Sequence, residues 1–153
     1  MTRESTTAEC LFCDIAAGRA EASLVYSDDA VVAFMDRYPV TPGHLLVVPR
    51  GHMVGLEDLD PGTGARIWGV GHALARALRR SQFRPGGINV LLCDGELAFQ
   101  SVFHFHLHVI PRYPGDGWEI EPNTHERARD LLDGDARVIR NAIDGATPDR
   151  LTP

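Results

Sequence analysis

Residues 103–109 read Phe-His-Phe-His-Leu-His-Val, a strict alternation of apolar residues and histidines. Successive side chains of a β-strand point to opposite faces of its sheet. The segment therefore predicts a strand over 102–111, with His104, His106 and His108 on one face and the apolar side chains directed into a core. A chain that contains this segment must build a sheet that is covered on at least one side.

Three interpretations of the histidine row compete. A polar strand face that happens to be rich in histidine is the simplest, but three of the seven histidines stand in this regular row. A metal site would use two or three of the imidazoles as ligands. Phosphate chemistry would use one imidazole as a nucleophile, because imidazole attacks phosphorus well and its phosphoramidate product hydrolyses readily. The motif by itself leaves the last two open.

The remaining hydrophobic patterns predict an α+β fold with an antiparallel sheet, since strands joined by short links surround one long helix. The expected strands are 24–26, 31–35, 44–48, 88–93 and 102–111, the long helix is 61–81, and weaker helical patterns cover 10–18 and 126–143.

Composition narrows the function classes. The net charge of −6, with no dense basic patch, argues against nucleic acid as the main partner. All 15 basic residues are arginine, which excludes Schiff-base chemistry and a lysine-dependent phosphate loop. No apolar run approaches the ~18 residues of a membrane span, and residues 1–9 contain no secretory segment. We therefore expect a cytoplasmic protein without membrane contacts.

The chain resembles the histidine triad (HIT) family, whose pattern is His-x-His-x-His followed by two apolar residues. Residues 104–110, His-Phe-His-Leu-His-Val-Ile, fit this pattern throughout. Residues 34–50 resemble the family's aspartate loop and the strand after it, and residues 94–102 resemble its phosphate loop. The resemblance covers about residues 10–118 in order and favours phosphate chemistry over the other interpretations.

The resemblance implies a role for each matching residue. His106 would be the nucleophile that attacks the α-phosphorus and becomes transiently nucleotidylated. His108 would donate to a non-bridging phosphate oxygen, and His104 would fix the strand and the tautomer of the nucleophile. Gln100 and Ser101 match positions that contact the phosphate and the leaving group.

The nucleotide pocket follows from the same resemblance. Asp36 matches the residue that accepts hydrogen bonds from the ribose hydroxyls. Asn89 matches a strand position whose side chain reaches toward the phosphate. Phe12, Ile15 and Phe34 would line the base pocket, although the same side chains suit a hydrophobic core equally well.

The chain departs from the family pattern in its phosphate loop. Cys93-Asp94-Gly95 stands where Asn-x-Gly is common, and Phe99 stands where glycine usually precedes the glutamine. A bulky Phe99 would reshape the leaving-group side of the pocket, so these departures bear on substrate choice. His44 resembles a buried family histidine behind the triad, and we expect it to be structural.

Cys10 and Cys13 form a C-x-x-C pair. The resemblance to bacterial HIT proteins implies a structural zinc held by this pair, by His52 after the third strand and by His104. Two thiolates and two imidazoles make a closed tetrahedral site. The alternatives are a redox pair, which the absence of a surrounding βαβ pattern disfavours, and two buried cysteines beside a surface histidine.

The resemblance also implies the architecture and the activity. The expected fold is HIT-like, with a five-stranded antiparallel sheet, one long helix and a C-terminal helix. Residues 1–9 are expected to be disordered, 10–118 to form the HIT domain, and 119–153 to pack on it. A two-fold homodimer is expected through the long helix and a strand. The expected activity is hydrolysis of a purine nucleoside phosphoramidate. The alternatives are a dinucleoside polyphosphate hydrolase or phosphorylase, and a non-catalytic nucleotide-binding adaptor.

Overall fold

The structure is a computed structural model that describes residues 10–121 and 124–143. The chain falls into two compact units, residues 1–117 and 118–153. The expected disorder of residues 1–9 lies outside the described residues. The packing of residues 119–153 on the domain stays a prediction.

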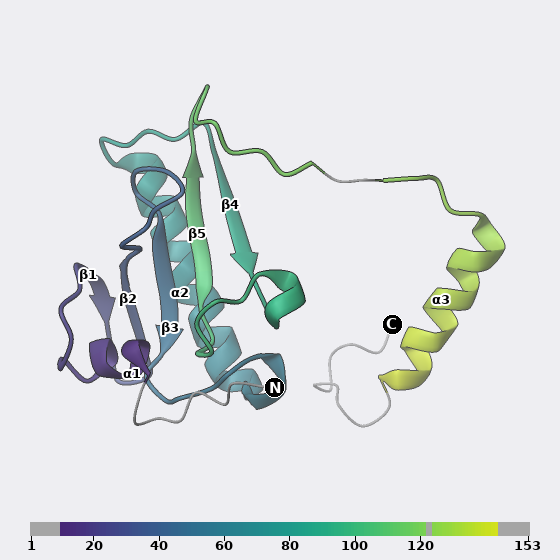
Figure 1. Cartoon of the computed structure of the whole chain (residues 1–153), viewed down its shortest axis with the longest axis horizontal. Helices are drawn as coiled ribbons and strands as arrows, with labels where there is room; N and C mark the ends of the chain where they lie inside the picture. The colour runs from purple at the N-terminus through teal and green to yellow at the C-terminus, as the bar shows by residue number, and fades with distance from the viewer. Residues whose placement is uncertain (1–9, 122–123, 144–153) are drawn as a thin grey trace. The chain divides into compact units, whose positions relative to one another are not determined.

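The first unit contains a five-stranded antiparallel sheet, which confirms the predicted α+β class (Figure 1). The strands lie in the order β1-β2-β3-β5-β4, so β5 is flanked on both sides and β4 forms an edge. Their bounds are β1 Leu24–Ser27, β2 Val31–Met35, β3 Leu45–Pro49, β4 Gly87–Leu92 and β5 Leu107–Arg112. The first hairpin turns at Asp28, whose Oδ1 accepts the backbone N–H groups of Ala30 and Val31.

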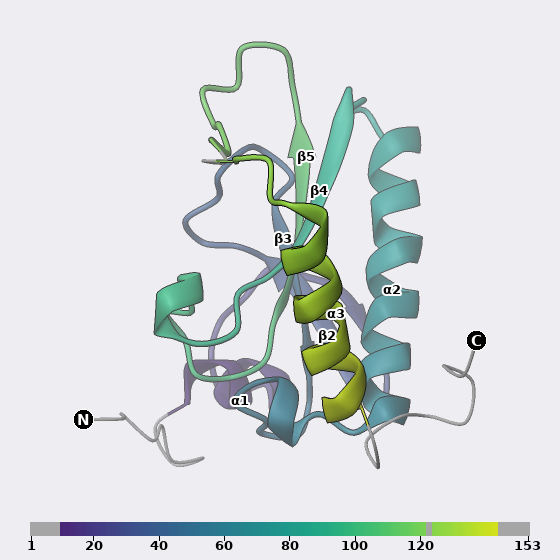
Figure 2. The same ribbon diagram turned by 90° about the vertical axis from the view of Figure 1, so that its right-hand side faces the viewer.

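The two faces of the sheet are covered by different helices. The long helix α2, Pro61–Arg80, lies along one face, and the short helix α1, Leu11–Ala16, lies at the other (Figure 2). Alternate residues of each strand therefore enter different cores. The core under α2 contains Val31, Ala33, Leu45, Val47, Ile67, Val70, Leu78, Phe105, Leu107 and Val109. The core under α1 contains Cys10, Phe12, Ile15, Ala16, Val32, Phe34, Leu46 and Val48.

Local sequence signals explain where α2 begins and how closely it approaches β5. Asp60 caps its first turn by accepting from the Thr63 backbone N–H, and Pro61 occupies the first helical position. Gly71 faces the sheet, and a Cβ there would lie 3.0 Å from Cδ2 of Leu107. The absence of a side chain lets the helix backbone pack against the strand that carries the histidines.

The last strand is shorter than the sequence pattern predicts. We expected it over 102–111, but β5 begins at Leu107. The ladder between β3 and β5 stops because Pro49, at the end of β3, has no backbone N–H to donate. The Pro49 carbonyl accepts a hydrogen bond from the His104 ring. The Phe105 N–H donates instead to the carbonyl of Met53, at 2.6 Å.

Two short 3₁₀ helices, Leu56–Asp58 and η3, Glu96–Ala98, were not expected from the sequence. In the second unit, α3 spans Arg129–Ala142, inside the predicted 126–143. Its apolar side chains, which include Leu131, Leu132, Val138 and Ile139, are exposed. Within the described residues, no helix combines the length and apolar character that crossing a bilayer requires.

Candidate active site

The three histidines keep the predicted alternation although two of them precede β5. Phe105 and Leu107 enter the core under α2, while His104 and His106 turn to the opposite side of the sheet. His104 is completely buried and His106 is 4% exposed. The rings of His106 and His108 lie 4.8 Å apart between centroids. The row is therefore a buried cluster and not a solvated strand face.

The tautomer of His106 follows from its one hydrogen bond. Its Nδ1 lies 2.6 Å from the carbonyl oxygen of His104, so Nδ1 carries the proton and donates it. The Nε2 of the neutral ring then holds a free lone pair. Burial lowers the pKa of His106, against the opposing effect of this backbone hydrogen bond. An unprotonated imidazole nitrogen is the form required of a nucleophile.

His108 receives the opposite tautomer through His44. The Val40 N–H donates to Nδ1 of His44 at 3.0 Å, so Nε2 of His44 carries the proton. This Nε2 lies 3.0 Å from Nδ1 of His108 and 3.5 Å from Oδ2 of Asp36. His44 therefore donates to Nδ1 of His108, whose proton resides on Nε2. Burial and the neighbouring rings of His106 and His44 lower the pKa of His108 to about 4.

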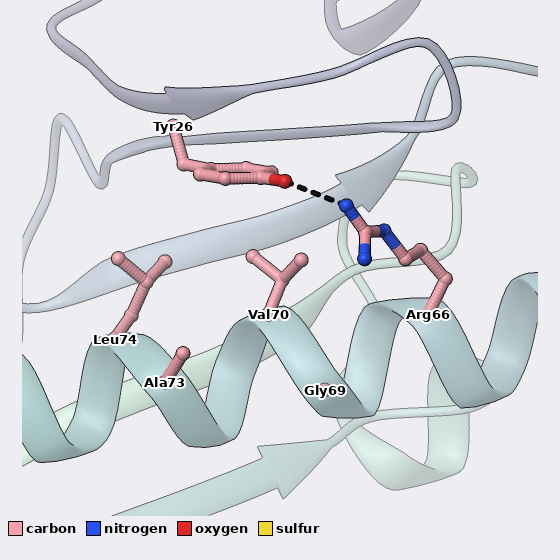
Figure 3. A pocket seen from close by; sticks show the side chains of 6 residues that line it. All are labelled: Tyr26, Arg66, Gly69, Val70, Ala73 and Leu74. Atoms are coloured by element: carbon pink, nitrogen blue, oxygen red, sulfur yellow. Dashed lines mark hydrogen bonds between the residues drawn. The ribbon is translucent and has the colours of Figure 1, made fainter.

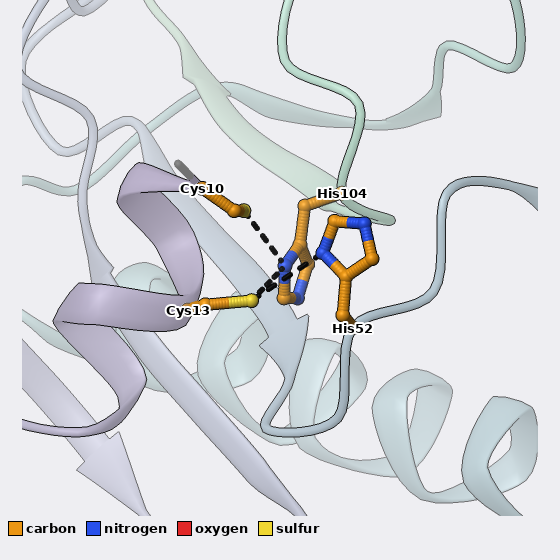
Figure 4. Close-up of side chains that lie close together, drawn as sticks. All are labelled: Cys10, Cys13, His52 and His104. Carbon is orange, nitrogen blue, oxygen red and sulfur yellow. Dashed lines mark hydrogen bonds between the residues drawn. The ribbon is translucent and has the colours of Figure 1, made fainter. Parts of the chain in front are cut away.

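The predicted metal ligands converge on one point (Figure 4). The sulfur and nitrogen donor atoms of Cys10, Cys13, His52 and His104 all lie within 4.8 Å of one another. Nδ1 of His104 is 3.4 Å from Sγ of Cys10 and 3.5 Å from Sγ of Cys13. Nδ1 of His52 is 3.3 Å from Sγ of Cys13. With zinc–ligand bonds of about 2.3 Å to sulfur and 2.0 Å to nitrogen, a tetrahedral edge is about 3.5 Å.

The surroundings of these ligands also suit a metal. Nε2 of His104 donates to the Pro49 carbonyl at 2.8 Å, which leaves Nδ1 unprotonated toward the sulfurs. Burial and the neighbouring Cys10 raise the pKa of the Cys13 thiol to about 11, so this thiol by itself keeps its proton. A dication beside the Cys13 sulfur would reverse that preference. The four side chains fit a closed four-coordinate site.

The predicted nucleotide contacts lie on both sides of the histidines. Asp36 uses Oδ1 to accept the Tyr38 N–H and is close to His44 through Oδ2. Asn89 lies on β4 and its Oδ1 accepts from Arg112 at 2.9 Å. The predicted base-pocket residues Phe12, Ile15 and Phe34 are all buried in the core under α1. The Phe12 and His106 ring centroids are 5.3 Å apart.

The predicted phosphate loop is held by one side chain. Oε1 of Gln100 accepts the Gly95 N–H at 2.7 Å, and its Nε2 donates to the carbonyls of Val54 and Val102 at 2.7 and 3.2 Å. Both amide protons of Gln100 are thus directed to backbone oxygens. Ser101, the next residue, is exposed.

The hydrogen-bond relay from Val40 through His44 to His108 was not predicted from the sequence, where we expected His44 to be structural. A buried histidine at the start of an apolar strand is a weak signal, and its partner His108 is 64 residues away in the chain. A shallow pocket lies on the other face of the sheet, between Tyr26 and one side of α2 (Figure 3). Arg66 in its wall is already bound to Tyr26 and Asp28, so we assign it no role.

Comparisons with known proteins agree with this geometry. The profile of the HIT domain matches residues 17–115. Protein hit of Bacillus subtilis is 40% identical over 135 residues, which cover 88% of this chain and 91% of the relative. The chain belongs to the HIT family. A HIT family protein from Bacillus anthracis is 39% identical in its crystal structure, with a TM-score of 0.83 over 88% of this chain and 97% of that one.

A further HIT structure bears on the cysteine–histidine cluster. The crystal structure of a Zn-bound histidine triad family protein from Mycobacterium smegmatis is 37% identical to this chain. The match has a TM-score of 0.71 and covers 93% of this chain and all of that protein. Family membership, the HIT-like fold and a metal-compatible cluster are therefore established for the chain.

Proposed function

We propose that the chain is a nucleotidyl hydrolase or transferase that cleaves nucleoside 5′-phosphate derivatives at the α-phosphate through a nucleotidyl-His106 intermediate. The observation that carries this proposal is the hydrogen bond from Nδ1 of His106 to the His104 carbonyl, since it leaves Nε2 as a free nucleophile. Purine nucleoside phosphoramidates are the proposed substrates.

The reaction would proceed in two displacements. Nε2 of His106 forms a bond to the α-phosphorus as the bond to the leaving group breaks, and the leaving group departs with the electron pair and takes up a proton. Water then attacks the same phosphorus and releases the nucleoside monophosphate and free His106. Nε2–H of His108 would donate to a non-bridging oxygen, where negative charge builds in the transition state.

The other predicted contacts complete this proposal. The free acceptor capacity of the Asp36 carboxylate would bind the ribose hydroxyls, and Phe12, Ile15 and Phe34 would support the base. Ser101 would contact the phosphate or the leaving group, with Asn89 nearby on β4. The three backbone contacts of Gln100 favour a role in holding the loop.

Zinc is the proposed metal of Cys10, Cys13, His52 and His104. A bound zinc would be structural, because four protein donors leave no open position for substrate. It would tie the N-terminal helix α1 to the segment before β5 and so support the His104 carbonyl to which His106 donates. The thiols are free, which suits the reducing cytoplasm that we propose as the compartment.

A homodimer is the proposed assembly. The strand β4, Gly87–Leu92, lies at the edge of the sheet, and the polar backbone groups of such an edge are commonly paired or covered. On α2, Trp68 is 59% exposed although Ile67 and Val70 beside it are buried. Both features suit a second copy that packs on the β4 and α2 side. Sedimentation velocity would test this, with Trp68→Glu expected to shift dimer to monomer.

The activity is tested by steady-state turnover of an adenosine 5′-phosphoramidate beside diadenosine tetraphosphate, for wild type and His106→Ala. We expect turnover of the phosphoramidate to fall at least about 10³-fold in the variant, as for loss of other catalytic nucleophiles. His72→Ala, at an exposed position of α2, is the matched control. Preferential turnover of the tetraphosphate favours the polyphosphate alternative. AMP binding without turnover favours the adaptor.

A further inference from the structure

Residues 52–58 lie in the connection between β3 and α2, and the first of them, His52, belongs to the cysteine–histidine cluster. Nδ1 of His52 lies 3.3 Å from Sγ of Cys13 (Figure 4). Its Nε2 is buried, and no residue in the described part of the chain provides a hydrogen-bond partner for it. The polar atoms of the His52 ring are therefore engaged by the cluster alone, so a metal bound there would fix the start of the segment.

The same segment is bonded to the chain around the proposed nucleophile. The Met53 carbonyl accepts the N–H of Phe105, the residue immediately before His106. The next carbonyl, that of Val54, accepts from Nε2 of Gln100 at 2.7 Å. Two successive carbonyls that follow a cluster ligand therefore hold the backbone beside the nucleophile and the end of the loop that leads to it.

The start of that loop is tied to the same segment by Asp94. Its Oδ1 accepts the Leu56 N–H at 2.9 Å. Gly55 makes this contact possible, because a Cβ at this position would overlap the Asp94 carboxylate. The φ of Gly55 is −155°, an extended value that other residues also adopt, so the glycine provides space here and not conformational freedom. Both ends of the 94–100 loop are thus attached to residues 52–58.

These hydrogen bonds link the metal cluster to the nucleotide site in a defined direction. A metal that fixes His52 removes conformational freedom from residues 52–58 before any nucleotide binds. The nucleotide then has less of the protein to order, so its affinity increases. Thermodynamic linkage requires the nucleotide to raise the affinity for the metal by the same factor.

We propose that metal occupancy of the cluster sets the affinity for a nucleoside 5′-monophosphate through residues 52–58, and that Asp94 is the positioning residue that attaches the loop to this segment. The inference rests on the proposed function and adds metal-dependent regulation of the same site. Asp94 is not one of the four cluster residues, so its substitution separates the coupling from metal binding itself.

The test is calorimetric titration of AMP into the full chain in its metal-free and zinc-loaded forms. Zinc is expected to lower the Kd of wild type for AMP about 10-fold, within the usual range of coupling between sites. Asp94→Ala still binds one equivalent of zinc, but the ratio of its two Kd values falls to about twofold or less. Asp94→Asn retains an Oδ1 acceptor and most of the ratio. Gly55→Ala displaces the carboxylate and lowers the ratio as Asp94→Ala does.

Glu57→Ala is the matched control. It removes an exposed carboxylate from the same segment and leaves the bond between Leu56 and Asp94 in place. This variant is expected to keep the wild-type ratio of Kd values. An equal loss of the ratio in Glu57→Ala and Asp94→Ala would overturn the assignment of Asp94, because removal of any negative charge would then account for it.

Hydrogen exchange on the zinc-loaded protein gives a second readout, which decides the matter if circular dichroism finds the metal-free form unfolded. AMP is expected to slow exchange of the Leu56 and Phe105 amides in wild type, and the effect at Leu56 is lost in Asp94→Ala. Equal AMP affinity with and without zinc, or unchanged exchange at both amides, overturns the inference alone. Absence of both AMP binding and phosphoramidate turnover in zinc-loaded wild type contradicts the proposed function itself.

Discussion

Two clusters of donor atoms lie on either side of His106: one is formed by Asp36, His44 and His108, and the other by Cys10, Cys13, His52 and His104. They differ in whether their donor atoms already have hydrogen-bond partners within the cluster. In the Asp36–His44–His108 cluster, a chain of hydrogen bonds begins at the Val40 N–H and runs through His44 to His108, and it places the proton of each imidazole on Nε2. In the cysteine–histidine cluster, the Nδ1 lone pair of His104 faces two thiols. Protons complete the first cluster, and the donor atoms of the second suit a cation.

The difference arises from the second nitrogen of each ring. Nε2 of His104 donates to a backbone carbonyl, so Nδ1 is left with a lone pair that can bind a metal. Nδ1 of His108 accepts from His44, so Nε2 carries the proton and is left as a donor. Between them, Nδ1 of His106 donates to the main chain, so its Nε2 is left with a free lone pair. Three identical residues thus receive three chemical roles from their neighbours.

The largest expected effect comes from removing the thiols. Cys10→Ser with Cys13→Ser should lower bound zinc from one equivalent to none, by elemental analysis. If free zinc exceeds its Kd about 1,000-fold, the lost stabilisation is about 4 kcal/mol. Tm should then fall by about 10 °C. Cys93→Ser, outside the cluster, should change neither quantity. Metal-free native protein of unchanged Tm would contradict the metal half of the comparison.

The proton chain is tested at His44. His44→Phe removes the donor to His108, so the His108 proton is no longer confined to Nε2. We expect kcat to fall on the order of 10²-fold, the usual effect of losing one transition-state donor. His44→Gln retains an N–H group and should recover part of the rate. Nitrogen chemical shifts of His108 report the tautomer, and an unchanged tautomer in the phenylalanine variant would disprove the relay.

A smaller effect is expected from pH. The unfolded chain protonates His108 below about 6.5, whereas the folded chain does so only near pH 4. Stability is therefore complete above 6.5 and decreases as the pH falls toward 4. For this residue the loss at pH 5 is about 2 kcal/mol. Denaturant unfolding at pH 7.5 and 5 should show it, and His108→Gln should weaken the dependence. If His108→Gln kept the same pH dependence of stability as the surface variant His72→Gln, the dependence would arise from other residues.

The sequence predicted the elements better than their ends. The alternation of apolar residues and histidines located the last strand, because this pattern can be recognised within the segment itself. The start at Leu107 depended on Pro49, which is 58 positions earlier and takes the His104 ring as its partner. The start of β5 is determined by a residue of another strand, so the sequence of residues 102–111 alone cannot predict it.

The candidate site shows the same limit. Family motifs located four candidate metal ligands, and the structure brings their donor atoms together. The relay through His44 and the three contacts of Gln100 were not predicted, because their partners are a distant ring and backbone groups. Backbone partners have no signature in the identity of the residues that provide them, so only the fold reveals them.

The most direct test of the account is to trap the intermediate. Wild-type protein is mixed in excess with an adenosine 5′-phosphoramidate, quenched at millisecond to second intervals, and digested for mass spectrometry. The account predicts one adenylyl group on His106, formed and lost at rates consistent with turnover, and no adduct in His106→Ala. Turnover by wild type with no adduct at any time, or an adduct on a different residue, would contradict it.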